Sequence, residues 1–484
     1  MSAKIAAFLQ ETVRLLKRRG VDYADLRWVE ETHEELIVQN GQVQHVSHST
    51  TEGVSIRVLH RGTWGHASSC RVDAEGLRHT AGKAMEMARA AALDAPAKVK
   101  LQPVPAVRAQ YRTPLEVDPF QVEMQKKIDY LLWAAQVLKE HDNVKTATAT
   151  LEFYRTRKLF CSTEGSLIEQ EVTESGGMLE ATAVLDNEVQ RRSYPTANSS
   201  SLAQAGYEHV KALDFVGQAV RVRKEAVALL RAKECPSGAA TVILLPDQLI
   251  LQIHESCGHP VELDRALGME LSFAGGSFLT PDVLGTYRYG SKCVNITADA
   301  TLPRGCGTFG YDDEGVAAQR VPVIREGLFV GYLSSRESAA AIHQSSTGAM
   351  RADGWSAVPI VRMTNVSLEP GTGTLADLIR DTRRGILMAT NKSWSIDDRR
   401  LNFQFGTEIG WEIRDGRLGQ ALKNPVYTGI TPEFWNSCSG VAGKEEWKLY
   451  GVPNCAKGEP VQLMHVGHGA SPARFEKVLV GRKK

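Results

Sequence analysis

The chain has 484 residues, more than the roughly 250–300 at which a single hydrophobic core stops growing, so at least two domains are expected. Its 57 Lys and Arg residues almost balance 56 Asp and Glu residues, and no long basic stripe occurs, which argues against a nucleic-acid or membrane partner. The sequence has no apolar run of ~18 residues, and its first residues lack the apolar segment of a signal peptide. Eight scattered cysteines without a CxxC pair complete the pattern of a cytoplasmic protein with reduced thiols.

The first hundred residues predict a helix, an antiparallel meander and a second helix. Apolar residues at helical spacing predict a helix over residues 2–19, and Asp73 is expected to begin another that ends near residue 92. Between these helices the sequence alternates, and Asn40-Gly41 is a strong hairpin signal. The strands are expected at residues 24–30, 35–38, 43–46, 54–59 and 64–69.

A second unit with the same order of elements follows an extended stretch, residues 101–114, that we interpret as a linker. A helix over 122–140 precedes a series of strands, and a long helix is expected over 201–232. The strands of this unit are expected at 147–155, 159–161, 166–172 and 178–185.

The character of the chain changes at Cys235-Pro236-Ser237-Gly238, after which short β segments and glycines are frequent. We therefore predict an α+β protein with two domains. Residues 1–233 form antiparallel sheets with flanking long helices, and divide further into units of about 1–100 and 115–233. Residues 234–484 form a β-rich domain that carries a helix near residue 250.

That helix contains the pattern His254-Glu255-x-x-x-His259. Two histidines with an adjacent glutamate on a helix are typical of a zinc site, in which the histidines bind metal and the glutamate activates water. On a regular α-helix at about 100° per residue, positions five apart diverge by about 140°. The two imidazoles can share one ion only if the helix widens into a π turn or ends near Gly258. The alternative is a helix with two incidental histidines.

A catalytic zinc takes three protein ligands and keeps one position for water, so a third ligand must come from elsewhere in the chain. Five residues are candidates, and spacing alone does not choose among them. They are Cys306, Cys438, Cys455, His465 and His468.

Several segments of the C-terminal half resemble the TldD/PmbA family of peptidases. They are residues 254–264 (HESCGHPVELD), 305–315 (GCGTFGYDDEG), 362–365 (RMTN), 455–458 (CAKG) and 466–469 (VGHG). Family members with the His-Glu pattern are the TldD-like, active type, whereas the TldE/PmbA type lacks it. This chain keeps the pattern and so resembles the active type. It departs from the family at Ala456, where a glycine is frequent.

The resemblance implies a zinc-dependent peptidase that hydrolyses unfolded or extended peptides. It implies His254, His259 and Cys455 as the ligands of one zinc per active site, with Glu255 as the general base. It also implies a dimer with an internal cavity, either a homodimer or a heterodimer with a metal-less TldE/PmbA-type paralogue.

Further polar residues lie close to these motifs. Glu262 and Asp264 could each accept the free ring N–H of a ligand histidine, or form a solvated acidic turn. Tyr311, Asp312 and Asp313 lie in a Gly-rich loop, where they could line the cleft or support it, and Tyr311 could stabilise an oxyanion. Two other functions stay open: a non-catalytic regulatory subunit of a peptidase complex, and a metal-dependent hydrolase of small amides.

Overall fold

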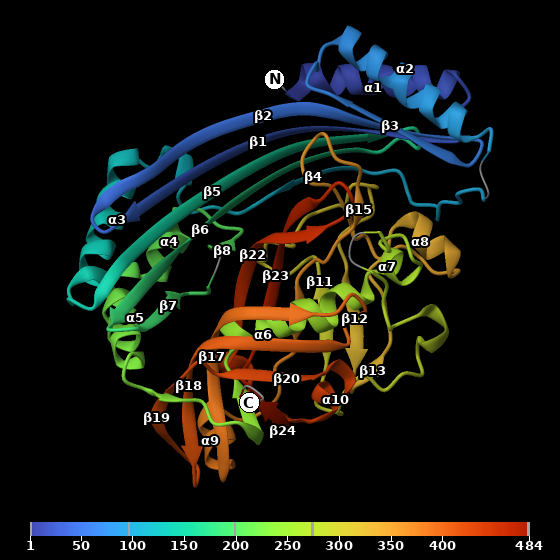
Figure 1. Ribbon diagram of the computed structural model, residues 1–484. Helices are drawn as coiled ribbons and strands as arrows, with labels where there is room; N and C mark the ends of the chain where they lie inside the picture. Colours follow the sequence, from blue (N-terminus) through green and yellow to red (C-terminus); the bar gives the residue numbers. More distant parts are fainter. Residues whose placement is uncertain (1, 95–96, 198–199, 273–274, 482–484) are drawn as a thin grey trace.

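The structure is a computed structural model that describes residues 2–94, 97–197, 200–272 and 275–481. A long curved sheet built from the N-terminal part of the chain arches over a β-rich C-terminal part (Figure 1). Helices flank the first sheet, and antiparallel pairing dominates both parts, so the predicted α+β class is confirmed.

The first sheet has the strand order β3-β2-β1-β5-β6-β4, with β7 and β8 paired to β6. Its strands are β1 Tyr23–Gln39, β2 Gln42–His60, β3 Thr63–Ser69, β4 Arg108–Arg112, β5 Val144–Ser162, β6 Leu167–Leu185, β7 Glu188–Tyr194 and β8 Ser201–Ala203. Strands that the sequence predicted as separate are therefore continuous. The predicted linker is also partly a strand, since β4 pairs in parallel with β6.

The polar stretch in the middle of β1 explains the missed continuity. Residues 30–35 break the apolar alternation, yet each pairs with both neighbouring strands: Glu31, for example, lies between Thr51 and Thr156. Hydrogen bonding to two partners therefore carries the strand through residues whose side chains alone do not favour it.

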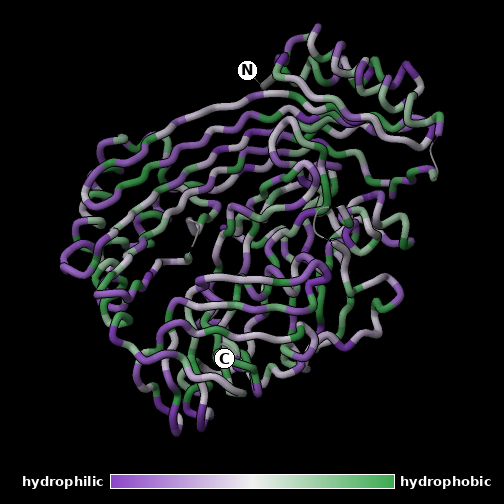
Figure 2. The backbone as a smooth tube through the Cα atoms, viewed as in Figure 1, coloured by the Kyte–Doolittle hydropathy of each residue, from purple (hydrophilic) through white to green (hydrophobic). Residues whose placement is uncertain are grey.

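In the described residues of this part, five α-helices cover one face of the first sheet, one group at each end (Figure 1). They are α1 Ser2–Arg18 and α2 Ala74–Ala91 at one end, and α3 Met124–Lys139, α4 Tyr207–Leu213 and α5 Phe215–Leu229 at the other. Because side chains alternate along a strand, Leu26 and Leu36 of β1 point to this same face. Leu26 belongs to the core beneath α1 and α2, and Leu36 belongs to the separate core beneath α3, α4 and α5. In Figure 2, hydrophilic and hydrophobic residues alternate along these strands and helices, as amphipathic elements require.

The single helix predicted over residues 201–232 is wrong. Its first residues form β8, and Asp214 interrupts the remainder between α4 and α5. Asp214 adopts a left-handed conformation with φ of 47°, and its carboxylate accepts a hydrogen bond from the N–H of Gly217. This side chain therefore begins a new helix instead of continuing the first.

The C-terminal part contains a second large sheet with the order β17-β10-β24-β20-β18-β19-β9, and β21 pairs with β24. The strands are β9 Lys233–Glu234, β10 Gly238–Leu244, β17 Arg384–Ile396, β18 Asn402–Arg414, β19 Arg417–Lys423, β20 Val426–Ile430, β21 Cys438–Val441 and β24 Ala473–Val480. The strands of the two large sheets thus come from residues 23–203 and 233–480. The domain boundary near residue 234 stays a prediction.

Smaller elements complete this part. A four-stranded sheet contains β11 Ile296–Asp299, β12 Arg320–Arg325, β13 Leu328–Phe329 and β16 Val366–Leu368; β14 Met350–Arg351 pairs with β15 Ile360–Val361, and β22 Lys448–Lys457 with β23 Gln462–Ala470. The helices are α6 Pro246–Ile253, α7 Leu263–Ala266, α8 Arg336–Ala341, α9 Leu375–Arg380 and α10 Thr431–Asn436. In the described ranges, no helix is long and apolar enough to cross a membrane.

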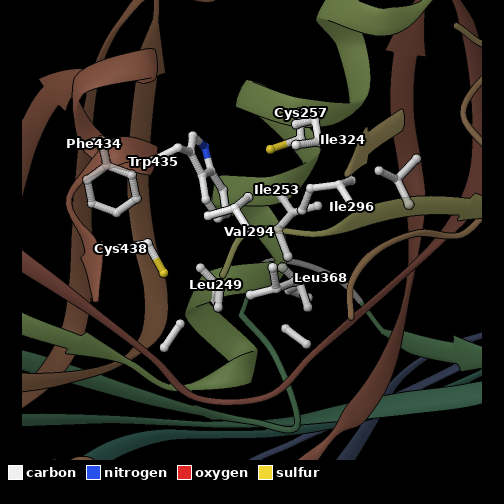
Figure 3. Close-up of a cluster of buried hydrophobic side chains, with 14 of the residues drawn as sticks. Leu249, Ile253, Cys257, Val294, Ile296, Ile324, Leu368, Phe434, Trp435 and Cys438 are labelled. Atoms are coloured by element: carbon white, nitrogen blue, oxygen red, sulfur yellow. The ribbon is translucent and has the colours of Figure 1, made fainter. Parts of the chain in front are cut away.

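The helix α6 lies in the middle of the C-terminal core. Leu249 and Ile253 pack with residues from the small sheet and from α10, including Ile296, Leu368 and Trp435 (Figure 3). Contacts on several sides fix the position of this helix, and with it the direction of the segment that follows Ile253.

Candidate metal centre

The segment after α6 is a π turn, His254–Gly258, followed by a short 3-10 turn, His259–Val261. The N–H of His259 donates to the carbonyl of His254, five residues earlier, which is the hydrogen bond that defines a π turn. The predicted widening of the helix between the two histidines is therefore confirmed. Gly258 lets this turn pack against Met363, because a Cβ at this position would lie 2.0 Å from the Sδ atom of Met363.

The π turn brings His254 and His259 to one side, with their ring centroids 5.0 Å apart. Cys455 approaches from β22, next to an irregularity in the pairing of β22 with β23 between Val452 and Cys455. The possible ligand atoms of these three residues all lie within 4.8 Å of one another, and the three side chains are buried. Two imidazoles and a thiol at this separation can hold one metal ion.

His468 of β23 fixes the orientation and the tautomer of His254. The Nδ1 atom of His468 lies 2.8 Å from the carbonyl oxygen of Val366, an acceptor, so His468 carries its proton there. Its Nε2 atom is therefore an acceptor and takes a hydrogen bond from Nδ1 of His254 over 2.8 Å. The Nε2 atom of His254 is left with a free lone pair.

Glu262 fixes the orientation and the tautomer of His259. Its carboxylate oxygen lies 2.9 Å from Nδ1 of His259 and accepts a hydrogen bond from the N–H group at that position. The Nε2 atom of His259 then faces the Sγ atom of Cys455 at 3.9 Å. Both histidines thus have Nδ1 already bonded, which leaves Nε2 of each ring available to a metal ion.

Asp264 has a different position from Glu262. Both its carboxylate oxygens accept from Nζ of Lys457 at 2.8 Å, and no ring nitrogen of His254 or His259 is among its hydrogen-bond partners in the described structure. Lys457 also lies 3.5 Å from Glu262, so it connects the two carboxylates. Asp264 thereby supports the segment of β22 that carries Cys455 and does not contact a histidine.

Charge and burial act against each other at Cys455. Burial raises the pKa of its thiol, but electrostatic interactions with His254, Arg362 and His259 outweigh burial and bring the pKa well below the usual value. Burial lowers the pKa of His259 far below its usual value. Two nitrogen donors and a thiolate suit a borderline-soft ion such as zinc, so the residues present fit this metal.

Glu255 faces the same cleft as the three residues, a cavity of about 330 Å³. Its carboxylate accepts a hydrogen bond of 2.7 Å from Nη1 of Arg400, which also lines the cleft. Sequence reasoning missed Arg400, since it lies in a polar loop with no motif around it. The cleft is lined by Thr196, Ala197, Asp247, Ile250, Leu251, His254, Glu255, His259, Asn391, Trp394, Arg400, Val452, Asn454, Cys455 and Ala456.

The other candidates for the third ligand lie elsewhere. His465 pairs with Glu174 at 2.5 Å, and Cys306 lines the same cavity as that pair, beneath the first sheet. Cys438 lies beside Cys293. Among the candidates, Cys455 is the one whose side chain joins the histidine pair, and His468 reaches His254 through a hydrogen bond.

The residues of the 311–314 loop also lie away from the metal centre. Tyr311 lines the cavity beneath the first sheet, and Asp313 pairs with Arg27 and Lys158 of that sheet at 2.6 and 2.5 Å. Asp312 accepts hydrogen bonds from backbone N–H groups, including that of Val316 at 2.9 Å. The ion pairs of Asp313 join the two parts of the chain, and a role of Tyr311 or the two aspartates in catalysis stays a prediction.

Comparisons with known proteins place this fold and its His-His-Cys cluster among the metallopeptidases. Residues 237–482 match the PmbA/TldA metallopeptidase C-terminal domain, and residues 24–88 match domain 1 of the same proteins. The chain belongs to the PmbA/TldD family of metallopeptidases.

Individual relatives extend over most of the chain. A metalloprotease of Methanocaldococcus jannaschii is 29% identical over 84% of this chain and 87% of its own length. A metalloprotease TldD homolog of Haemophilus influenzae is 25% identical over 96% and 94%, respectively. The crystal structure of TldE from Thermococcus kodakarensis superposes with a TM-score of 0.75 at 16% identity, over 98% of this chain and 100% of that one, and shows the same fold.

Proposed function

We propose that this protein is a zinc-dependent peptidase of the TldD type, with zinc held by His254, His259 and Cys455. The observation that supports this most strongly is the orientation of the two rings. Each histidine has Nδ1 engaged by a buried acceptor, Nε2 of His259 faces the cysteine thiol, and the possible ligand atoms of all three residues lie within 4.8 Å of one another. When bound, zinc would act as a Lewis acid toward the scissile carbonyl and lower the pKa of a water molecule.

Glu255 is the general base in this proposal. It lies next to His254 in the sequence, faces the cleft and is oriented by Arg400. Its carboxylate takes a proton from the attacking water and delivers it to the nitrogen of the leaving amine, so one residue serves both steps. Arg400 keeps the carboxylate from rotating out of the cleft.

We infer extended or unfolded peptides as substrates. The cleft has polar groups from Thr196, Asn391 and Asn454 along its walls, which are suited to hydrogen bonds with a peptide backbone. A TldD-type chain would act as a dimer, either with a second copy or with a TldE/PmbA-type partner. The second candidate function is hydrolysis of small amides, because the same metal centre and general base could act on the carbonyl of a small amide.

One experiment tests both parts of the proposal. Metal analysis of the purified protein is expected to give about one zinc per chain. Glu255→Gln should keep the zinc and lose nearly all cleavage of an unfolded peptide, because the amide cannot accept a proton. Glu433→Gln, which removes the same charge from an exposed position on α10, is the matched control and should keep full activity.

The substrate panel separates the candidates. Cleavage by the wild-type enzyme is measured for three substrates: an unfolded polypeptide, the same polypeptide in its folded state, and a small amide. Cleavage of the small amide alone would replace the peptidase assignment by that of an amide hydrolase. Substantial cleavage by the Glu255→Gln variant would place the general base elsewhere.

A further inference from the structure

Two cysteines outside the metal centre have neighbouring sulfurs. The Sγ atoms of Cys293 and Cys438 lie 3.6 Å apart, and Sγ of Cys293 also lies 3.2 Å from the carbonyl oxygen of Cys438. Cys293 is half-buried in the loop before β11, whereas Cys438 is buried at the start of β21. A disulfide needs about 2.05 Å between the sulfurs, so the two atoms must approach by about 1.5 Å.

The two segments that carry these cysteines also hold the π turn of the metal centre. Trp435, three residues before Cys438, donates from Nε1 to Oγ of Ser256 at 2.9 Å. Tyr289, four residues before Cys293, donates its hydroxyl to the carbonyl of Ser256. Ser256 lies between His254 and His259, so both segments contact the centre of the turn.

A backbone hydrogen bond already joins the segments, from the N–H of Ser291 to the carbonyl of Trp435 at 3.1 Å. Trp435 and Cys438 lie together on one side of α6 and the π turn, and Val294, next to Cys293, lies in the same core (Figure 3). A covalent bond here would fix the relative position of two supports of one turn.

We propose that Cys293 and Cys438 form a peroxide-sensitive pair of thiols, whose reversible disulfide clamps the two segments that hold the turn bearing His254 and His259. This inference goes beyond the peptidase proposal and does not depend on it. A disulfide in a reducing compartment is usually transient and responds to oxidants, and two sulfurs 3.6 Å apart are close enough for such a response.

The reaction requires a peroxide as oxidant and proceeds in two balanced steps. The thiolate sulfur of Cys293 attacks one peroxide oxygen; an S–O bond forms, the O–O bond breaks, and hydroxide leaves, to be protonated to water. The sulfur of Cys438 then attacks the sulfenic sulfur of Cys293, the S–S bond forms, the S–O bond breaks and a second water leaves. Two thiols thus give two electrons and two protons to one molecule of hydrogen peroxide.

Exposure and hydrogen bonding make Cys293 the first sulfur to react. It is half-buried and so accessible to peroxide, unlike Cys438. A hydrogen bond with Cys438 lowers the pKa of Cys293 to about 6, which favours the thiolate at neutral pH. The buried Cys438 is placed to attack second.

The test uses the full-length protein as purified, treated with hydrogen peroxide and then alkylated. Peptide mass spectrometry should find the Cys293 and Cys438 peptides joined in most molecules, and dithiothreitol should separate them. Cys235 is half-buried like Cys293 and should stay alkylated in the same sample, which makes it an internal control. In the Cys438→Ser variant, Cys293 should be trapped as a sulfenic acid by dimedone.

Thermal unfolding measures the clamp itself. The midpoint of the oxidised wild-type protein should lie above that of the reduced protein, and this difference should vanish in Cys293→Ser. Both thiols still alkylated after peroxide treatment, or Cys293 oxidised further without a cross-link, would overturn the proposal. Because the cross-link is measured in the wild-type chain, the result stands even if the Cys438→Ser variant does not fold.

Discussion

The hydrogen bond between His468 and His254 offers a direct test of how the metal centre is built. His468 is fully buried and bridges Nδ1 of His254 and the carbonyl of Val366. We compare two replacements: His468→Leu, which removes both hydrogen bonds, and His468→Gln, whose amide oxygen and N–H₂ group can reproduce them.

The expected losses follow from the contacts. His468→Leu leaves two buried polar groups without partners, at about 1–3 kcal/mol each, so the free energy of unfolding should fall by about 2–6 kcal/mol. Loss of a partner that orients a metal ligand weakens metal binding about 10–100-fold, which equals about 1.4–2.7 kcal/mol. His468→Gln should recover most of both losses.

Competition with a zinc chelator measures the affinity, and urea unfolding of the metal-free protein measures stability. Unchanged affinity in His468→Leu would refute the view that His468 fixes the tautomer of His254. An equally complete loss of zinc in both variants would make His468 a direct ligand, and the assignment of Cys455 would then need to be revised.

Three other predictions follow from the same structure. Gly258→Ala should destabilise the protein by about 1–3 kcal/mol in thermal unfolding, because its Cβ would collide with Met363, whereas Gly82→Ala in α2, where nothing lies within 4 Å, should be neutral or stabilising. Cys455→Ser should abolish stoichiometric zinc in metal analysis, and a variant that keeps full zinc would exclude the cysteine as a ligand. Burial and, to a smaller extent, nearby arginine charges lower the pKa of His66 to about 4. The His66 imidazole therefore binds a proton more readily in the unfolded chain than in the folded protein. Stability should therefore rise with pH between about 4 and 6.5, and His66→Gln should flatten this slope in pH-dependent unfolding.

Local spacing predicted the shape of the metal-bearing turn, because an i,i+5 histidine pair on a helix has few geometric solutions. The sequence predicted one of the hydrogen bonds that orient the rings, from His259 to Glu262, but neither the one from His254 to His468 nor the one from Arg400 to Glu255. His468 lies 214 residues from His254, and Arg400 lies 145 residues from Glu255, so their contacts depend on the tertiary fold. The quoted family motifs already contained His468, but nothing in their spacing revealed its role.

The fold, like the metal centre, was predictable where local sequence patterns determine it and not where long-range contacts do. The antiparallel meander and its outer helices were legible from periodicity and from Asn40-Gly41, which forms the turn between β1 and β2. The length of β1 could not be predicted in this way, because hydrogen bonding to two neighbouring strands compensates for the polar residues in its middle. The break at Asp214 was not predicted either, because the apolar spacing continues across it and a single residue in the left-handed conformation separates α4 from α5.

The separation of the two halves of the metal centre along the chain has a consequence for biosynthesis. Cys455 follows His259 by 196 residues, so at a synthesis rate of about 5–20 residues per second the ribosome needs roughly 10–40 s to reach it. During this interval the growing chain already carries both histidines and Glu255, but neither the thiolate nor His468, which orients the first ring. A nascent chain therefore has an incomplete centre during this interval, and under the proposed function it can hydrolyse peptides only once β22 and β23 have formed.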